Sequence, residues 1–173
     1  SYIVEIVDNV TITPKSDTPT SQKKVQDVND STGETTGWQD SADYDIGDSV
    51  PFQLTFTLPN NVSAYEAYYV SFVDTLSPGL TYDDNSAVIY INGNRVDALE
   101  PAGPYADTKN PGSTMVYWTI QDITAAPYNA GDNDVITIEF TATLNEDAAI
   151  GYVGNPNNLY VDYSNNPGMT TTG

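Results

Sequence analysis

The chain has 173 residues, including 24 acidic and five basic side chains, and it contains neither histidine nor cysteine. A formal net charge of −19 at pH 7 argues against nucleic acid or an anionic membrane surface as a partner. Without cysteine there are no disulfides, thiolate nucleophiles or cysteine-based zinc sites, and without histidine the most frequent general base and metal ligand is missing. No apolar run approaches the roughly 20 residues of a membrane-spanning helix, so we expect no membrane insertion of this fragment. We also expect no cofactor.

The composition predicts an all-β domain, since 13 tyrosines and many threonines and valines occur among scattered glycine, proline and asparagine residues. Residues 1–19 begin as a strand and continue as a proline-containing segment, which we expect to be the end of a preceding domain or a linker. The main domain is predicted over residues 20–167, and a second linker over residues 168–173. Because the chain begins inside a strand-like stretch and ends in GMTTTG, we expect it to be a fragment of a longer protein.

Within the main domain, alternation of apolar and polar residues predicts most of the strands. In chain order, the predicted elements are a strand at 21–28, an acidic loop at 29–48, a strand at 49–59, a short helical turn in 60–69, a strand and a Ser-Pro-Gly turn in 68–82, a strand with an Asn-Gly hairpin in 86–96, and strands at 113–120, 133–145 and 158–164. Roughly seven short strands at this spacing indicate an immunoglobulin-like β-sandwich.

One carboxyl group falls on an apolar strand face. In the segment YYVSFVDTL, Asp74 is in phase with Phe72 and Leu76, so alternation predicts that it points inward. A buried carboxyl group favours its protonated form, because desolvation disfavours the charge. The alternative interpretation is that the strand ends here and that Asp74 turns to solvent.

A lysine and two asparagines also fall on inward faces. Lys23 is in phase with Val25 on the first strand of the main domain, whereas Lys24 lies on the polar face. An inward lysine next to one valine can also be an edge residue whose ammonium group reaches solvent. On the last strand, the phase that turns the apolar side chains inward also places Asn157 and Asn165 on that face.

An inward lysine, carboxyl group and asparagine can react with one another. Burial favours the neutral, nucleophilic form of the amine, and a protonated carboxyl group can polarise the carbonyl of the amide. Attack by the amine then releases ammonia and joins the two side chains, without histidine, cysteine or a metal. The first and last strands of such a sandwich can lie side by side, which would hold the reactants in contact.

Several stretches of the chain, in this order, resemble the isopeptide-forming domains of sortase-assembled pilus backbone (major fimbrial) proteins from Gram-positive bacteria. They are PTSQKKV, DIGDSVPFQLTFTLP, FVDTLSPGLTY, ITIEFTATLNEDAAIG and GNPNNLYVDYSNNP, and the resemblance extends from about Lys15 to Pro167. It implies a Cna-type immunoglobulin-like sandwich with an intramolecular isopeptide bond. It also implies a structural role in an extracellular, cell wall-anchored surface fibre, with neighbouring pilin subunits as partners.

The resemblance also implies roles for individual residues. Lys23 matches the bonding lysine, Asp74 the carboxyl catalyst and Asn157 the bonding asparagine. Lys24 is the alternative amine, disfavoured by its phase, and Asn165 is the alternative amide. Asn157 is preferred because a parallel pairing of the first and last strands would place the start of its strand near Lys23. Such a domain performs one intramolecular reaction and is not expected to be an enzyme.

A second motif concerns assembly. The stretch VTITPKSDTP resembles the lysine-bearing motif that sortase joins to the next subunit, which makes Lys15 the candidate acceptor. It lacks the tyrosine before the proline and the asparagine after the lysine that the family often shows, so an exposed linker lysine is the alternative. The family's carboxyl-terminal sorting signal is absent, as expected for an internal fragment.

Three other functions fit parts of the sequence. A surface adhesin module that binds carbohydrate or another host ligand would use exposed aromatic rings, and Trp38 lies in a polar segment. Calcium would find oxygen ligands in Asp27, Asn29, Asp30 and Glu34, but their spacing departs from the EF-hand pattern, and no metal is predicted. A glycosidase would need two carboxylates facing a cleft, and a chain this acidic supplies carboxylates everywhere.

Overall fold

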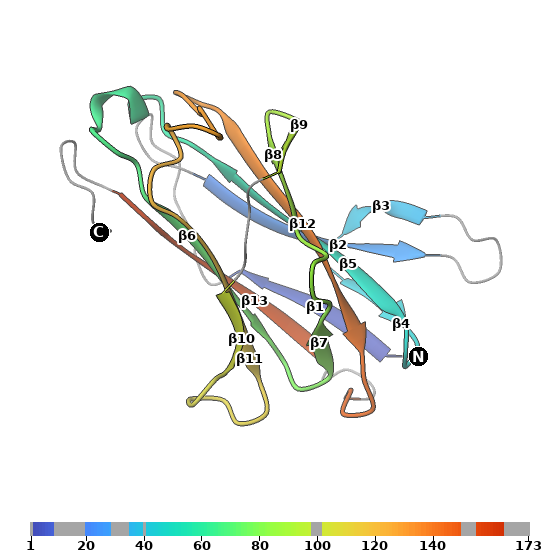
Figure 1. Ribbon diagram of the computed structural model, residues 1–173. Coiled ribbons are helices and arrows are strands. Elements are labelled where there is room, and N and C mark those ends of the chain that lie inside the picture. The colour runs from blue at the N-terminus through green and yellow to red at the C-terminus, as the bar shows by residue number, and fades with distance from the viewer. Residues whose placement is uncertain are drawn as a thin grey trace.

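The structure is a computed structural model that describes residues 2–8, 20–28, 35–39, 41–97, 102–149 and 155–164. Side chains are described from Tyr44 onward, apart from Leu159 and Tyr160, and the earlier strands are described by their backbone pairing. These residues form two β-sheets that pack against each other (Figure 1). We name them sheet A and sheet B.

Sheet A has six strands in the order β10-β11-β6-β13-β1-β4. Its neighbouring strands are antiparallel except for β1 and β13, which run parallel. The strands are β10 (Ala102–Ala106), β11 (Thr114–Ile120), β6 (Val70–Leu76), β13 (Asn155–Tyr163), β1 (Tyr2–Asp8) and β4 (Ser41–Tyr44).

Sheet B has seven strands, all antiparallel to their neighbours. Six follow the order β3-β2-β5-β12-β8-β9, and β7 pairs with the carboxyl-terminal end of β12. The strands are β2 (Thr20–Val28), β3 (Thr35–Gln39), β5 (Ser49–Thr57), β7 (Leu80–Tyr82), β8 (Val88–Ile91), β9 (Asn94–Val96) and β12 (Val135–Leu144).

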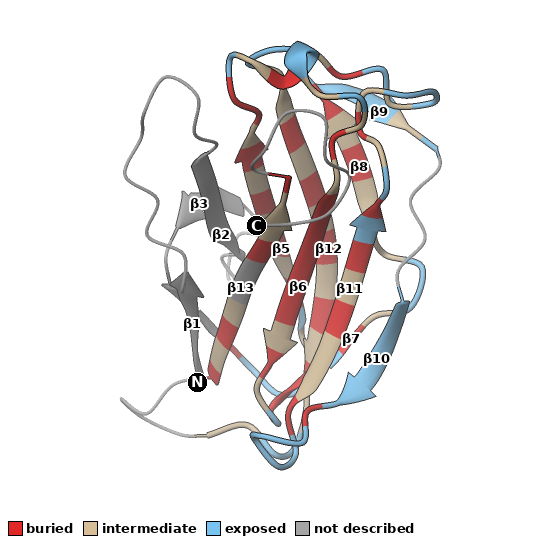
Figure 2. Cartoon of the chain, turned by 90° about the vertical axis from the view of Figure 1, so that its left-hand side faces the viewer, coloured by how far each residue is buried: buried red, intermediate tan, exposed pale blue. Residues whose placement is uncertain are grey.

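The core lies between the two sheets and is built by alternation. Along β5 and β12 every second residue is buried, because successive side chains of a strand point to opposite faces. Phe56 of β5 packs against Phe72 of β6 and Tyr163 of β13, and Trp118 of β11 packs against Phe140 of β12, with ring centroids 5.0 to 5.9 Å apart. Figure 2 shows the alternating bands on β11 and β12, whereas β6 is buried along almost its whole length.

Most of the predicted elements are confirmed. The predicted strands at 21–28, 49–59, 113–120 and 133–145 correspond to β2, β5, β11 and β12, and the predicted helical turn is the single 3-10 turn Val62–Ala64. The hairpin between β8 and β9 turns at Asn92 and Gly93, whose φ angles of 50° and 81° are the left-handed values that this dipeptide favours. The all-β sandwich predicted from composition and periodicity is therefore confirmed.

Two features differ from the prediction. The predicted acidic loop at 29–48 contains the strands β3 and β4, and β10 was not predicted at all. All three lie at or next to sheet edges and lack clear alternation, so the partner strands, not a hydrophobic pattern, select their conformation. β10 is exposed at all five positions and contains Pro104, which an edge strand tolerates.

Strand β1 falls in the segment that the sequence assigns to a preceding domain or linker, and here it pairs with β13 and β4. The proposed domain boundaries remain predictions. Among the described residues, no helix has the length and apolar character needed to cross a membrane.

Candidate functional site

Asp74 lies in the middle of sheet A and is completely buried, with an exposed fraction of 0%. It occupies the fifth position of β6, and its strand continues to Leu76. The interpretation that Asp74 marks a strand end facing solvent is therefore wrong. The residues directly opposite it are Val116 on β11 and Leu159 on β13, so the positions that flank the carboxyl group in the sheet are apolar.

Asn157 is the polar neighbour of Asp74 on β13. It is also completely buried, and it lies opposite Leu76, two positions along from the residue that faces Asp74. Diagonal neighbours of this kind share one face of the sheet, with positions about 7–8 Å apart. The structure thus brings together the predicted acid and the predicted amide inside the core.

The backbone of Lys23 lies in the opposite sheet. β2 pairs with β5, and the register places Lys23 opposite Leu54 and Lys24 opposite Gln53. Leu54 is completely buried in the core, whereas Gln53 is half-buried and bonds to Glu139 on the other face of sheet B. Directly opposite residues share a sheet face, so the register agrees with the phase predicted for the two lysines. Their side chains lie outside the described residues.

The predicted side-by-side pairing of the lysine strand with the last strand is wrong. The parallel partner of β13 is β1, and β2 belongs to sheet B. Alternation shows which face a residue occupies, but it does not show which sheet its strand joins. The two sheets approach each other at this edge, where Cα atoms of β2 come within 8 Å of those of β1 and β4.

Packing between the sheets shows where the Lys23 backbone lies, along the strand direction, relative to Asp74 in the other sheet. Phe56 of β5 contacts Phe72 of β6, with ring centroids 5.8 Å apart. β7, which follows β6, pairs with the end of β12 that also pairs with the start of β5. Moving from Phe56 to Leu54 therefore leads in the same direction as moving from Phe72 to Asp74. The backbone of Lys23, opposite Leu54, consequently lies at the level of Asp74, across the core.

A second buried asparagine was missed by the sequence analysis. Asn155 is 2% exposed and precedes Asn157 by two positions, so the same alternation could have identified it. Its side-chain Oδ1 accepts a hydrogen bond from the Ala149 amide at 2.7 Å, and its Nδ2 donates to the Ala149 carbonyl at 3.1 Å. These bonds distinguish the two asparagines, because the Asn155 amide is tied to a neighbouring backbone segment.

Other predicted residues lie outside the described part of the chain. This applies to Lys15, the alternative amide Asn165 and the loop residues Asn29, Asp30 and Glu34, as well as to the side chains of Asp27 and Trp38. Among the described residues, no group of three or more carboxylates is arranged to hold a metal ion.

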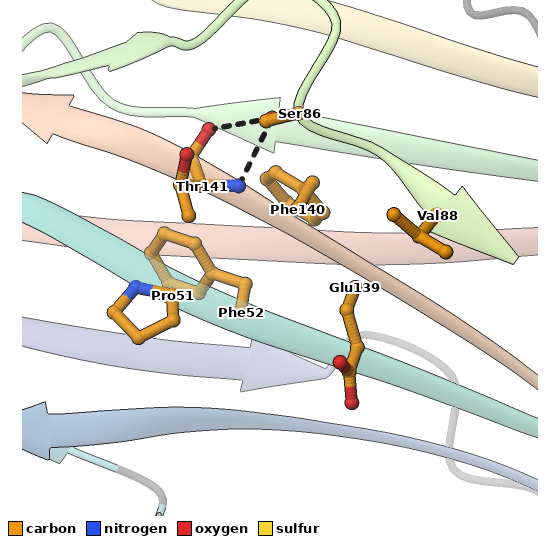
Figure 3. Close-up of a pocket in the computed structure, with 7 residues that line it drawn as sticks. All are labelled: Pro51, Phe52, Ser86, Val88, Glu139, Phe140 and Thr141. Carbon is orange, nitrogen blue, oxygen red and sulfur yellow. Dashed lines mark hydrogen bonds between the residues drawn. The ribbon is translucent and has the colours of Figure 1, made fainter. Parts of the chain in front are cut away.

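A shallow hollow of about 240 Å³ lies over β5, β12 and the segment leading into β8 (Figure 3). Its charged lining group, Glu139, accepts a hydrogen bond from Gln53 Nε2 at 3.0 Å, and Ser86 bonds to the backbone of Thr141. None of the predicted reactive residues lines it. Among the described aromatic side chains Tyr105 alone is strongly exposed, so this part of the chain lacks a platform of several rings for a sugar.

The family model for the Gram-positive pilin backbone subunit 2, Cna-B-like domain, matches residues 46–167, more than half of the chain. The chain belongs to this family. The matched range contains Asp74, Asn155 and Asn157, and it excludes the two lysines of β2.

A relative of this pilin domain is found in Streptococcus pyogenes. The trypsin-resistant surface T6 protein of Streptococcus pyogenes is 30% identical over 164 residues, which cover 88% of this chain and 27% of that protein. The chain thus spans about a quarter of the length of this relative.

Solved structures of pilus proteins share the fold. The pilus backbone RrgB of Streptococcus pneumoniae matches with a TM-score of 0.56 and 22% identity, covering 90% of this chain and 56% of that one. The carboxyl-terminal fragment of the major pilin GBS80 of Streptococcus agalactiae matches with a TM-score of 0.57 and 20% identity, covering 85% and 49%. The resemblance to pilus backbone domains and the Cna-type sandwich fold are therefore confirmed.

Proposed function

We propose that this pilin domain is a structural module of a surface pilus backbone, stabilised by an autocatalytic isopeptide bond between Lys23 and Asn157. One observation carries the proposal: Asp74 and Asn157, both completely buried, are diagonal neighbours on adjacent strands, and the residues directly opposite them are the apolar Val116, Leu159 and Leu76. A buried carboxyl group beside a buried amide is costly in a domain that needs only packing, and it is useful in one that performs a reaction.

The reaction needs no group beyond these three side chains. Desolvation favours the protonated form of Asp74 and the neutral form of a buried lysine amine. The carboxyl proton of Asp74 polarises the Asn157 carbonyl, and Lys23 Nζ attacks the amide carbon. The new C–N bond forms as the old one breaks. One lysine proton passes through the Asp74 carboxyl group to the departing amino group, which leaves as ammonia.

In this proposal the bond runs across the core from one sheet to the other. β2 belongs to sheet B and β13 to sheet A, so the bond would pass through the core and join the two layers. Such a covalent tie across the core would prevent the two sheets from separating under a pulling force. The domain forms the bond once and is not an enzyme in this proposal.

The proposal extends to assembly at the cell wall. Lys15 lies a few residues before β2 and would accept the carboxyl end of a neighbouring pilin subunit from a sortase. The family membership supports neighbouring pilins as partners, and the sequence motif around Lys15 supports this residue as the acceptor. The finished fibre would be anchored to the wall of the bacterium.

Intact mass spectrometry of the folded domain tests the central claim. The measured mass should lie below the sequence mass by one ammonia, and tandem spectra should join a Lys23 peptide to an Asn157 peptide. Lys23→Ala should restore the full mass, whereas the matched variant Lys24→Ala should remain cross-linked. An unmodified mass of the wild-type domain would overturn the proposal, and loss of the bond only in Lys24→Ala would reassign the amine.

A further inference from the structure

Two buried asparagines occupy equivalent faces of β13, and they differ in what holds them. The Asn155 side chain forms a closed pair of hydrogen bonds with the amide and the carbonyl of Ala149. We call this pair the Asn155 clamp. A reaction at the Asn155 amide would release its amino group as ammonia and so break the bond to the Ala149 carbonyl, which favours a supporting role for this residue.

The clamp belongs to a tightly packed end of the sandwich. A Cβ atom added to Gly79 would lie 2.5 Å from Asn155 Oδ1 and 2.6 Å from the Ala148 Cα, so only glycine fits there. The Ser77 amide donates to the Pro156 carbonyl at 3.1 Å, and the Asn145 amide donates to the Gly79 carbonyl at 2.8 Å. The turn after β6, the turn after β12 and the start of β13 are therefore fixed relative to one another.

The hydrogen bonds at this end of the sandwich fix the register of β13 against β6, which hydrophobic packing alone does not determine. A slip of one residue would turn the apolar residues of β13 to the other face, and burial strongly opposes it. A slip of two residues keeps every apolar side chain on its face, because side chains alternate with period two. Such a slip can bring Asn155 to the position opposite Leu76, diagonal to Asp74, and it then moves Asn157 to the position directly opposite Asp74. The Asn155 clamp opposes this slip directly.

We propose that Asn155 is a positioning residue for isopeptide formation: its clamp on Ala149 fixes the register of β13 that places Asn157, and not Asn155, opposite Leu76 and diagonal to Asp74. This inference rests on the proposed function, because it assigns a role in that reaction. It also predicts which of the in-phase asparagines is the reactant. Asn155 acts through the backbone and does not touch the reacting atoms.

The test follows the rate of bond formation in the whole chain. The wild type and its variants are made by cell-free translation, quenched in acid at intervals, and the fraction that has lost ammonia is measured by mass. Asn155→Ala should slow the reaction by about tenfold or more, since misplacing the reactants removes the advantage of proximity. Gly79→Ala, which presses on the clamp without removing Asn155, should also slow it.

Two controls separate positioning from general stability. Asn158→Ala changes the neighbouring residue on the opposite face of β13 and should react at the wild-type rate. Val161→Ala weakens the core on the same strand, and it should also react normally although it melts at a lower temperature. Equal slowing of Val161→Ala and Asn155→Ala would overturn the inference.

The conservative variant Asn155→Asp adds a second measurement, the pH dependence of the reaction rate, which a purely structural role of Asn155 would not change. In Asn155→Asp, the new carboxyl group reproduces both bonds to Ala149 only when it is protonated. The ratio of its rate to the wild-type rate should therefore rise as the pH is lowered from about 8 to about 5, since burial favours protonation of a carboxyl group. This variant also keeps the test decisive if Asn155→Ala does not fold.

The outcomes distinguish the two proposals. A wild-type chain that never loses ammonia overturns the proposed function, and the positioning role with it. A wild-type chain that reacts while Asn155→Ala reacts equally fast overturns only the positioning role. Tandem spectra that locate the bond at Asn155 would do the same, because they would make the clamp residue the reactant.

Discussion

Replacing Asp74 by alanine is the most informative perturbation of this domain. The carboxyl group is completely buried, and Asn157 is its diagonal neighbour across one strand pair. Without the acid, no proton polarises the Asn157 carbonyl, so Asp74→Ala should fold and keep the full sequence mass. Ammonia loss in this variant at the wild-type rate would show that another acid promotes the reaction.

The expected effect on stability can be worked from the loop that the bond closes. A tie between residues 23 and 157 encloses about 130 residues, for which the chain-entropy model of cross-links gives about 5 kcal/mol of stabilisation. Engineered cross-links often deliver less, so about 3–5 kcal/mol is a realistic range. In a domain of this size, 1 kcal/mol corresponds to about 2–4 °C, and the melting temperature should fall by about 6–20 °C.

A double-mutant cycle isolates the bond from the packing change at Asp74. In the Lys23→Ala background no bond can form, so Asp74→Ala there reports only the exchange of a buried carboxyl group for a methyl group. The free energy of unfolding from urea titration should fall by about 3–5 kcal/mol more in the wild-type background than in the Lys23→Ala background. Equal losses in the two backgrounds would refute the reasoning, since Asp74 would then act through packing alone.

Three further predictions follow from other parts of the chain. Lys15→Ala should abolish polymer formation when sortase and a partner subunit are supplied; unchanged polymer on a gel would assign the acceptor elsewhere. Burial acts to raise the pKa of Asp122, but hydrogen bonds from the Thr124 hydroxyl and from the Tyr68 and Thr124 amides outweigh it and hold the pKa below its usual range. A depressed pKa stabilises the fold at pH values above the unfolded pKa of about 4, and this stabilisation is lost as the pH falls. Asp122→Ala should therefore lower the free energy of unfolding by about 1–3 kcal/mol at neutral pH, and urea titrations should show a smaller difference from the wild type below about pH 4. A difference that does not depend on pH would contradict the assignment. Burial, with repulsion from Tyr65 and Tyr163, raises the pKa of Tyr68, and its hydroxyl has no hydrogen-bond partner among the described residues. Because stability linked to a raised pKa is lost as the pH rises above about 10, Tyr68→Phe should change stability by less than about 1 kcal/mol at neutral pH and should unfold at higher pH than the wild type in an alkaline titration; greater sensitivity to alkali would count against it.

Alternation along single strands predicted the burial of Asp74 and Asn157 but not their surroundings. Asp74 and Asn157 were identified because a polar residue in phase with apolar neighbours must either lie in the core or end the strand. The cross-sheet position of β2 could not be predicted, because pairing between strands depends on contacts distant in sequence. The preference for Asn157 rested on a strand pairing that the structure assigns to β1 instead.

Asn155 shows a second limit of reasoning from pattern. Its phase equals that of Asn157, so the sequence offers two equivalent inward amides at the start of β13. The hydrogen bonds of Asn155 to Ala149 are a contact between separate segments, which the alternation within one strand does not reveal. Edge strands posed a related problem, since β3, β4 and β10 take their conformation from their neighbours.

The exposed strand β10 has a consequence for crowding along a fibre. When many copies of one domain lie close together, their exposed edge strands can pair with one another and cause aggregation. β10 forms one border of sheet A, and Pro104 in its centre has no amide hydrogen to offer an incoming strand. Copies of the domain lying side by side are therefore less prone to pair through this border of sheet A.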